Sequence, residues 1–119
     1  MINLTQHPAS PEQIAAGVRD LDPHQRTLLV QALTVDALPT RAEIHDRCEA
    51  IATLALASGA RQAMIGGAPW MMSTLERALR AVQCEPVYAF SMRESAEHVQ
   101  PDGSVRKVTV FRHAGFVLA

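Results

Sequence analysis

A short apolar run that ends in two glycines and a proline constrains the fold of this chain more than any other stretch. Residues 63–65 (Ala-Met-Ile) have the composition of a buried strand, and Gly66 and Gly67 follow directly. Pro69 suits the first position of a helix, because its missing N–H would have no partner there. A helix N-terminus after a strand also presents free N–H groups to an anion. Two interpretations remain open: a tight strand-to-helix turn, or an anion site at that turn.

Fuller phosphate-binding loops carry more glycines or a lysine, and this stretch has neither. The glycines therefore predict where a site would lie, and they say less about its chemistry. Two glycines next to each other do let another group approach the backbone closely.

Two helices are predicted between the first residues and position 33. Ser10, Pro11 and Gln13 form a capping box, and we expect the helix that they start to run to about Leu21. Its apolar positions 14, 18 and 21 would share one face. An Asp-Pro pair at 22–23 repeats the start signal. The second helix would carry leucines 28, 29 and 33, although residues 27–30 also fit a strand.

The third helix has the most complete pattern in the chain. Thr40 and Glu43 form its capping box, and Gly59 is a natural stop. The apolar residues of its inner face are spaced four, three and four apart: Ile44, Cys48, Ile51 and Ala55. A fourth helix is expected from Pro69 to about Val82.

Strands fill the remaining stretches. Residues 1–5 open the chain as a strand, and residues 86–91 form another that can continue to Val99. Residues 101–104 (Pro-Asp-Gly-Ser) predict a hairpin turn, with a returning strand at 105–111. Helix-length connections favour parallel strands. We therefore expect a single α/β domain over residues 1–119: a small open Rossmann-like sheet, mostly parallel, covered by helices, with an antiparallel C-terminal hairpin strand.

Composition bounds the classes of partner. The 119 residues suit one domain, and the net charge of −1 gives no reason to expect duplex nucleic acid. Aromatic residues are only 4% of the chain. Alanine-rich helices bury little area each, so we expect a homodimer to complete the core.

The cysteines and the apolar runs indicate the compartment. Cys48 and Cys84 match neither a disulfide framework nor a zinc motif, and they fit buried free thiols in a reducing compartment. No run approaches the length of a membrane span or a signal peptide. We expect a cytoplasmic protein with no membrane partner. Histidines and carboxylates at metal-ligand spacing are absent, so we expect no metal and no cofactor.

In an open α/β sheet the ligand crevice lies beyond the carboxyl ends of the parallel strands. Several segments would meet there and offer hydroxyls, an amide, arginines and histidines. The expected ligand-binding residues are Thr5, Gln6, Gly66, Gly67, Ser91, Arg93 and Arg112, and the expected acid–base residues are His7 and His113. This collection suits a phosphorylated small molecule, because arginine supplies paired donors and histidine can move a proton near neutral pH.

Each of these residues also has a plainer interpretation. His7 can satisfy loop backbone groups, and Arg93 and Arg112 can form cross-strand ion pairs with nearby glutamates. For Trp70, a core or dimer contact weighs more than base stacking.

The opening residues resemble a known group. Residues 3–8 (Asn-Leu-Thr-Gln-His-Pro) and 10–13 (Ser-Pro-Glu-Gln) are similar to the start of small CRISPR-associated, CARF-type proteins with a Rossmann-like domain. Those proteins begin with an Asn-Phe-Ser-His or Ser-His element and a Thr-x-Glu-Gln helix start. The group includes binders of cyclic oligoadenylate in antiviral defence, some of which hydrolyse it as ring nucleases. The resemblance implies that Thr5, Gln6 and His7 abut such a ligand. It covers the first dozen or so residues.

Three hypotheses follow. The first is a nucleotide-type ligand site shared across a homodimer, with metal-independent phosphodiester cleavage in which a histidine acts as acid or base and an arginine stabilises the oxyanion. The second is a non-catalytic module that binds a small phosphorylated molecule. The third is an interaction protein that assembles through its alanine-rich helices and residues 70–72.

Overall fold

The computed structural model describes the whole chain, Met1 to Ala119, and a five-stranded sheet runs through it in the order β2-β1-β3-β4-β5. The strands are β1 (Ile2–Asn3), β2 (Arg19–Asp20), β3 (Gln62–Ile65), β4 (Glu85–Val99) and β5 (Val105–Leu118). The pairs β1–β2, β1–β3 and β3–β4 are parallel, and the pair β4–β5 is antiparallel. The predicted fold class, a mostly parallel α/β sheet with an antiparallel C-terminal strand, is confirmed.

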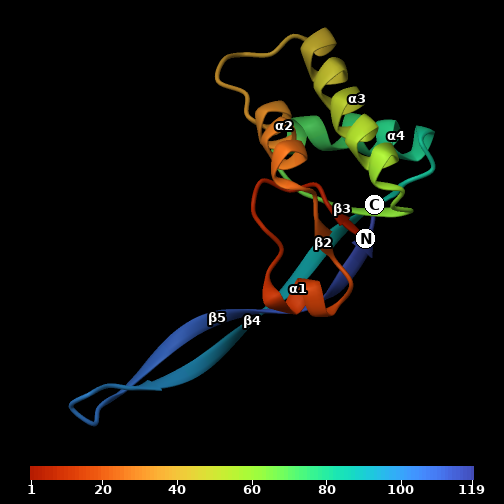
Figure 1. Cartoon of the computed structure of the whole chain (residues 1–119). Coiled ribbons are helices and arrows are strands. Elements are labelled where there is room, and N and C mark those ends of the chain that lie inside the picture. The colour runs from red at the N-terminus through yellow and green to blue at the C-terminus, as the bar shows by residue number, and fades with distance from the viewer.

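Four helices accompany the sheet: α1 (Pro11–Ala15), α2 (Pro23–Leu33), α3 (Arg41–Ser58) and α4 (Pro69–Ala81). In Figure 1, α2, α3 and α4 gather together on one side, whereas α1 lies apart from them near β4 and β5. The predicted caps are present. Ser10 and Gln13 close a capping box, Asp22 and Thr40 cap α2 and α3, and Gly59 ends α3 in the left-handed conformation.

The first helix is shorter than predicted. It ends at Ala15, and Gly17 follows with a φ of +101°, a value that L side chains rarely adopt. The chain then turns into β2 instead of continuing to Leu21. Val18 and Leu21 are buried in two different clusters, and Ile14 is exposed. These three residues are spaced as on a helix, but they do not share one helix face.

The main core lies between the sheet and the three grouped helices. Leu29 of α2, Ile51 of α3, and Leu75 and Leu79 of α4 are fully buried there against β1 and β3. Met64 and Val87 point to the other face of the sheet and form a smaller cluster with Ala9 and Val18, which flank α1. Alternation along the strands therefore divides the apolar residues between two faces.

Both cysteines are free and buried, as predicted. Burial raises the pKa of the Cys48 thiol to about 11, and burial also raises the pKa of Cys84. None of the helices combines the length and the apolar character needed to cross a bilayer.

The C-terminal hairpin is the most extended part of the molecule. Its turn lies at Pro101–Gly103, within the predicted turn at 101–104, and β5 continues past the predicted end at residue 111 to Leu118. Beyond the body, β4 and β5 project as a two-stranded ribbon of residues 91–113, here called the arm (Figure 1). The molecule consequently measures 56 × 32 × 26 Å along its principal axes.

Candidate functional site

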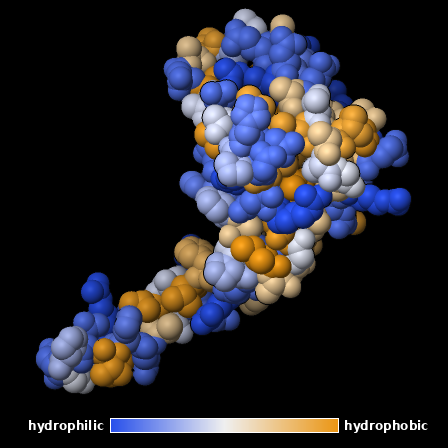
Figure 2. All heavy atoms as spheres, in the orientation of Figure 1, coloured by the Kyte–Doolittle hydropathy of each residue, from blue (hydrophilic) through white to orange (hydrophobic).

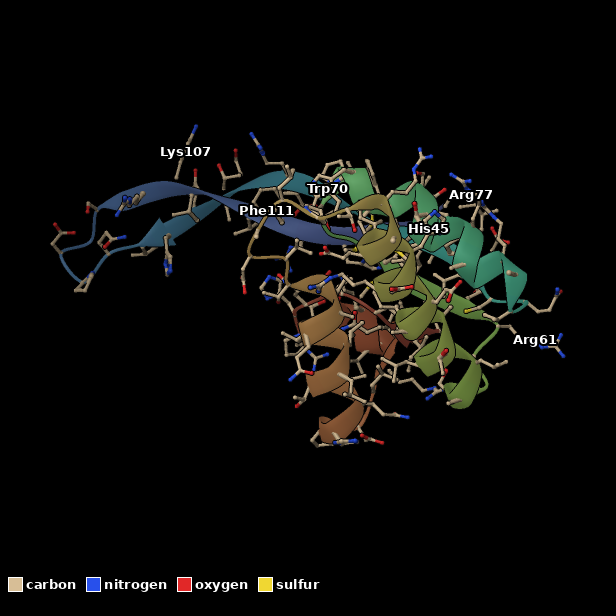
Figure 3. The ribbon with its side chains drawn as sticks, turned by 90° about the horizontal axis from the view of Figure 1, so that it is seen from above. His45, Arg61, Trp70, Arg77, Lys107 and Phe111 are labelled. Carbon is tan, nitrogen blue, oxygen red and sulfur yellow. The ribbon has the colours of Figure 1, made fainter.

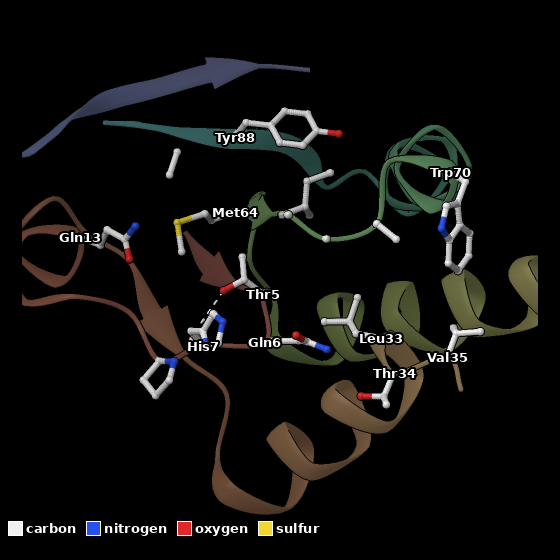
Figure 4. Close-up of a pocket in the computed structure, with 16 residues that line it drawn as sticks. Thr5, Gln6, His7, Gln13, Leu33, Thr34, Val35, Met64, Trp70 and Tyr88 are labelled. Carbon is white, nitrogen blue, oxygen red and sulfur yellow. Dashed lines mark hydrogen bonds between the residues drawn. The ribbon is translucent and has the colours of Figure 1, made fainter. Parts of the chain in front are cut away.

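A cavity of about 790 Å³ opens at the carboxyl edge of the parallel strands. Its walls come from segments far apart in the chain: residues 5–8 after β1, 64–68 around the end of β3, Tyr88 and Ala89 of β4, residues 33–35 after α2, and Gln13 and Trp70. Figure 4 shows Tyr88 across the cavity from His7, with Gln13 at one end and Trp70 at the other. The predicted location of the site, at this edge, coincides with the largest cavity that we describe.

Asn3 holds the segment after β1, residues 5–8, which forms one wall of the cavity. Its fully buried side chain accepts hydrogen bonds from the backbone N–H (2.9 Å) and the hydroxyl (2.7 Å) of Thr5. The same amide donates to the carbonyl oxygen of His7 at 2.7 Å and to Oδ1 of Asp20 at 2.8 Å. All the hydrogen-bonding capacity of the amide is thereby used, and residues 5–7 are held in a tight turn. The Asn-Leu-Thr-Gln-His stretch therefore works as one unit built around its asparagine.

A second layer supports this turn from β2 and α2. Asp20 Oδ1 also accepts the N–H of Ala9 at 3.1 Å, and Arg26 Nη1 lies 3.7 Å from it. Arg26 Nη2 donates to the carbonyl oxygen of Gln6 at 3.1 Å. As a result, the side chains of Gln6 and His7 are exposed on a backbone that is anchored from three elements.

The glycine pair forms the second wall. No hydrogen bond occupies the N–H groups of Gly66, Gly67 and Ala68, and α4 begins at Pro69 with no side-chain cap. Gly67 has a φ of +155°, and a Cβ there would lie 3.4 Å from Met72 Cε. The turn lines the cavity with three residues whose N–H groups have no partner, as expected for a strand followed by a helix start.

Tyr88 forms the third wall, and its hydroxyl donates to Oε2 of Glu76 at 2.8 Å. Burial and this hydrogen bond raise the pKa of Tyr88 from 10.0 to about 12. The neutral phenol is therefore favoured in the folded state, and its contribution to stability is complete below pH 10 and is lost as the pH rises toward 12.

We predict that Tyr88, the single tyrosine of the chain, ionises in the native protein with a midpoint near pH 12. The ultraviolet absorbance of tyrosinate measures this directly. Glu76→Gln should lower the midpoint without restoring the unfolded value, because burial is the larger cause. Glu85→Gln is the control and should leave it unchanged. A titration midpoint near the ordinary value of 10.0 in the folded wild type would contradict the burial of Tyr88 and its hydrogen bond to Glu76.

The structure brings together only some of the predicted site residues. Thr5, Gln6, His7, Gly66 and Gly67 line the cavity. Four others do not line it and lie on the arm: Ser91, Arg93, Arg112 and His113. The expectation that these four gather at the strand edge is wrong, because β4 does not end there. It continues past the end of β3, which pairs with β4 only as far as Tyr88.

The four arm residues have local partners instead. Arg112 Nε lies 3.4 Å from Glu94 Oε2, and the Arg93 guanidinium stacks 5.5 Å from the centroid of the Phe111 ring. The backbone N–H of His113 donates to Glu12 Oε2 at 3.2 Å. Because of a bulge, Phe90 pairs with Gly115 and Ser91 pairs with His113. The cavity consequently has no arginine, lysine, aspartate or glutamate in its lining.

Positive charge lies on the other side of Trp70. The indole, 49% exposed, also lines a second cavity of about 390 Å³ between α3 and α4. Arg41 and His45 of α3 and Arg77 of α4 line it, together with two hydroxyl residues, Ser73 and Thr74. The three ion pairs of the structure involve other arginines. In the view of Figure 3, His45 and Arg77 lie near each other, Trp70 lies between them and Phe111, and Lys107 lies further out on the arm.

Sequence reasoning missed this second cavity. Arg41 and His45 are one helical turn apart, as are Trp70, Ser73 and Arg77 in steps of three and four, so each set shares a helix face. That spacing is a usable signal within one helix. The proximity of the two sets depends on how α3 packs against α4, which no local pattern specifies.

Fold and site together define an α/β protein with a ligand-sized cavity at the carboxyl edge of a parallel sheet. The chain belongs to the uncharacterized protein MJ1673 family, whose model matches residues 1–117 and therefore includes the arm. No curated protein and no solved structure matches the chain significantly. His, Cys, Asp and Glu side chains nowhere form a group of three or more that could hold a metal ion.

Proposed function

We propose that this protein binds a phosphorylated, nucleotide-type ligand that lies across Trp70. The observation that carries the proposal is the position of the indole between two cavities of different character. The cavity at the strand edge is uncharged, and the cavity between α3 and α4 is lined by Arg41, His45 and Arg77. A ligand with an aromatic, uncharged part and an anionic part matches this division.

The uncharged cavity suits a base and a sugar. Half of its lining is apolar, and the rest offers the amides of Gln6 and Gln13, the hydroxyl of Thr34 and the imidazole of His7. The N–H groups of residues 66–68, which have no partner, add further donors. Such a mixture of apolar surface and a few placed polar groups is typical of small-molecule sites.

The charged cavity suits phosphate. Two guanidinium groups can each donate paired hydrogen bonds to phosphate oxygens, and no carboxylate lines the cavity to compete with them. An exposed indole beside arginines is also a favourable surface for stacking a base. A ligand of more than one nucleotide unit, a cyclic oligonucleotide included, could occupy both cavities at once.

His7 and His113, the acid–base residues predicted from the sequence, do not lie beside the arginines of the charged cavity, so we propose binding and assign these two residues no chemical step. Metal-independent phosphodiester cleavage needs an acid or base beside a cation. His7 lines the uncharged cavity, which has no cation, and His113 lies on the arm. Free buried thiols fit a reducing, cytoplasmic setting for such a binding protein.

The test is a titration of AMP, ATP and cyclic oligoadenylates into the wild type, followed by calorimetry and by fluorescence of the single tryptophan. Ligand stacking should change the Trp70 emission. Arg41→Ala and Arg77→Ala should each weaken binding by about 1–3 kcal/mol, the value of hydrogen bonds to charged groups. His7→Ala should leave any bound cyclic ligand uncleaved, as in the wild type.

Two controls make the result specific. Arg61→Ala removes the same charge at the start of β3, at the opposite end of the strands, and should not change the affinity. Arg93→Ala and Arg112→Ala test the sequence-based hypothesis, in which the arm arginines hold the ligand. If none of the nucleotides binds, or if Arg41→Ala and Arg77→Ala bind as the wild type does, the proposal is wrong.

A further inference from the structure

The arm has an unpaired strand edge on each side. β3 pairs with β4 only through Gln62–Ile65, so the β3-side edge of β4 is free from Ala89 to Val99. β5 is the last strand of the sheet, and no strand pairs with its outer edge, where only the N–H of His113 has a partner, Glu12 of α1. Long unpaired edges readily pair with another strand.

The faces of the arm are also unpartnered. Met92 and Phe111 are 55% and 66% exposed, and Val99 and Val105 near the tip are exposed as well. Figure 2 shows apolar side chains along the arm, away from the body. No residue of the arm belongs to either core cluster. A two-stranded ribbon without a third strand or a helix against it is marginally stable in water.

We propose that the free edge of β4 pairs antiparallel with the same edge of a second copy of this chain. The two-fold axis passes beside Ser95, so that Ser95 faces Ser95 of the second copy. The product is a four-stranded ribbon in the order β5-β4-β4-β5. A two-fold pairing closes on itself and leaves no β4 edge for further growth.

The charges of β4 favour this pairing. With Ser95 on the axis, Arg93 faces Glu97 of the second copy, and Glu97 faces its Arg93. These two side chains form no ion pair within one chain. Opposite charges directly across an antiparallel pair are stabilising, and the symmetry makes the contact twice.

The charges of β5 disfavour the alternative edge. β5 carries Arg106, Lys107 and Arg112 and no acidic residue. Pairing of β5 with β5 therefore places cations near cations and offers no opposite charge. Pairing of β4 with β5 of a second copy is head-to-tail and leaves edges for open-ended growth. Of these pairings, β4 with β4 of a second copy is the one that places opposite charges together and that closes as a dimer.

This pairing has a consequence for the cavity at the strand edge, a step that rests on the proposed function. In the same register, Val99 of the second copy faces Ser91, and its turn continues toward Ala89 and Tyr88, which line the cavity. His98 and Arg106, paired neighbours next to that turn, would then lie beside a cavity that has no cation of its own. The second copy would then place positive charge at the rim of this otherwise uncharged cavity.

Cross-linking and light scattering test the pairing without any ligand. The wild type should have twice the 12.9 kDa chain mass. Ser95→Cys should form a disulfide between copies under mild oxidation, because residues opposite each other lie within disulfide range. Thr109→Cys is the matched control: it is the β5 partner of Ser95, at the same height on the arm but at the other edge. Cross-linking through Thr109→Cys and not through Ser95→Cys would overturn the proposal.

A charge exchange makes the test specific for the register. Glu97→Arg should raise the dimer dissociation constant about tenfold or more, because Arg93 of each copy then meets a cation. Combining it with Arg93→Glu restores opposite charges and should restore the dimer. If the wild type is monomeric at all concentrations, or if Glu97→Arg leaves the dimer dissociation constant unchanged, the proposal is wrong.

Arg106→Glu separates the two parts of the inference. The variant should remain dimeric, because Arg106 is on β5, but it should bind ATP several-fold more weakly than the wild type if the second copy completes the cavity. A dimer that binds ATP equally well with and without Arg106 overturns the contribution to the cavity and leaves the strand pairing standing. If the dimer forms and no nucleotide binds the wild type, the proposed function fails and the completed cavity fails with it.

Discussion

Asn3→Ala should lower the free energy of unfolding by about 2–4 kcal/mol, because several buried groups lose their hydrogen-bond partner at once. The Asn3 amide is fully buried and joins Thr5, His7 and Asp20 through four hydrogen bonds of 2.7 to 2.9 Å. Alanine leaves these partners unsatisfied and leaves a cavity under the turn. Urea denaturation followed by circular dichroism measures the loss.

Two further variants separate hydrogen bonding from packing. Thr5→Val removes only the hydroxyl from this network and should cost about 1 kcal/mol. Asn3→Asp keeps the shape but places a carboxylate against Asp20 Oδ1 and the His7 carbonyl oxygen. Its pKa should be raised, so the deficit relative to wild type should shrink as the pH falls and the new carboxyl becomes protonated. If Asn3→Ala is as stable as the wild type, the turn does not depend on this amide.

The glycine pair should respond asymmetrically to substitution. Gly67→Val is expected to destabilise the protein by about 1–3 kcal/mol, because a β-branched residue at a φ of +155° is strained and its Cβ would contact Met72 Cε at 3.4 Å. Gly66→Ala is the matched control. Its φ is outside the glycine-favouring region, and its Cβ would meet Thr5 Cγ2 at an ordinary 3.7 Å. That change should stay within about 0.5 kcal/mol.

The direction of the Gly67 Cβ also changes how binding data are interpreted. The Cβ would lie 3.4 Å from Met72 of the core and 4.0 Å from Leu33, which also lines the cavity, so a larger residue would strain the turn as well as reduce the space for a ligand. Loss of ligand binding in Gly67→Val should therefore accompany loss of stability. Equal denaturation midpoints for Gly67→Val and Gly66→Ala would show that the turn adapts without strain.

The placement of the candidate site was partly accessible from the sequence. The glycine pair and the residues after β1 were expected at one edge, and they line the same cavity. Arg93 and Arg112 were expected there as well, although the strand at 86–91 was allowed to continue to Val99. They lie outside the cavity because β3 stops at Ile65 while β4 continues to Val99 and carries these residues away from the body. The length of a strand beyond its neighbour depends on pairing with β5, which is a property of two strands and not of one.

What the sequence by itself determined about this protein is local. Ser10 with Gln13, Thr40 with Glu43, and Gly59 set helix boundaries, because capping satisfies backbone groups within a few residues of the cap. Only the tertiary structure decided that Trp70 divides an uncharged cavity from one lined by Arg41 and Arg77. Those side chains come together through the packing of α3 on α4 over the sheet, and packing energy depends on contacts between residues that are distant in the chain.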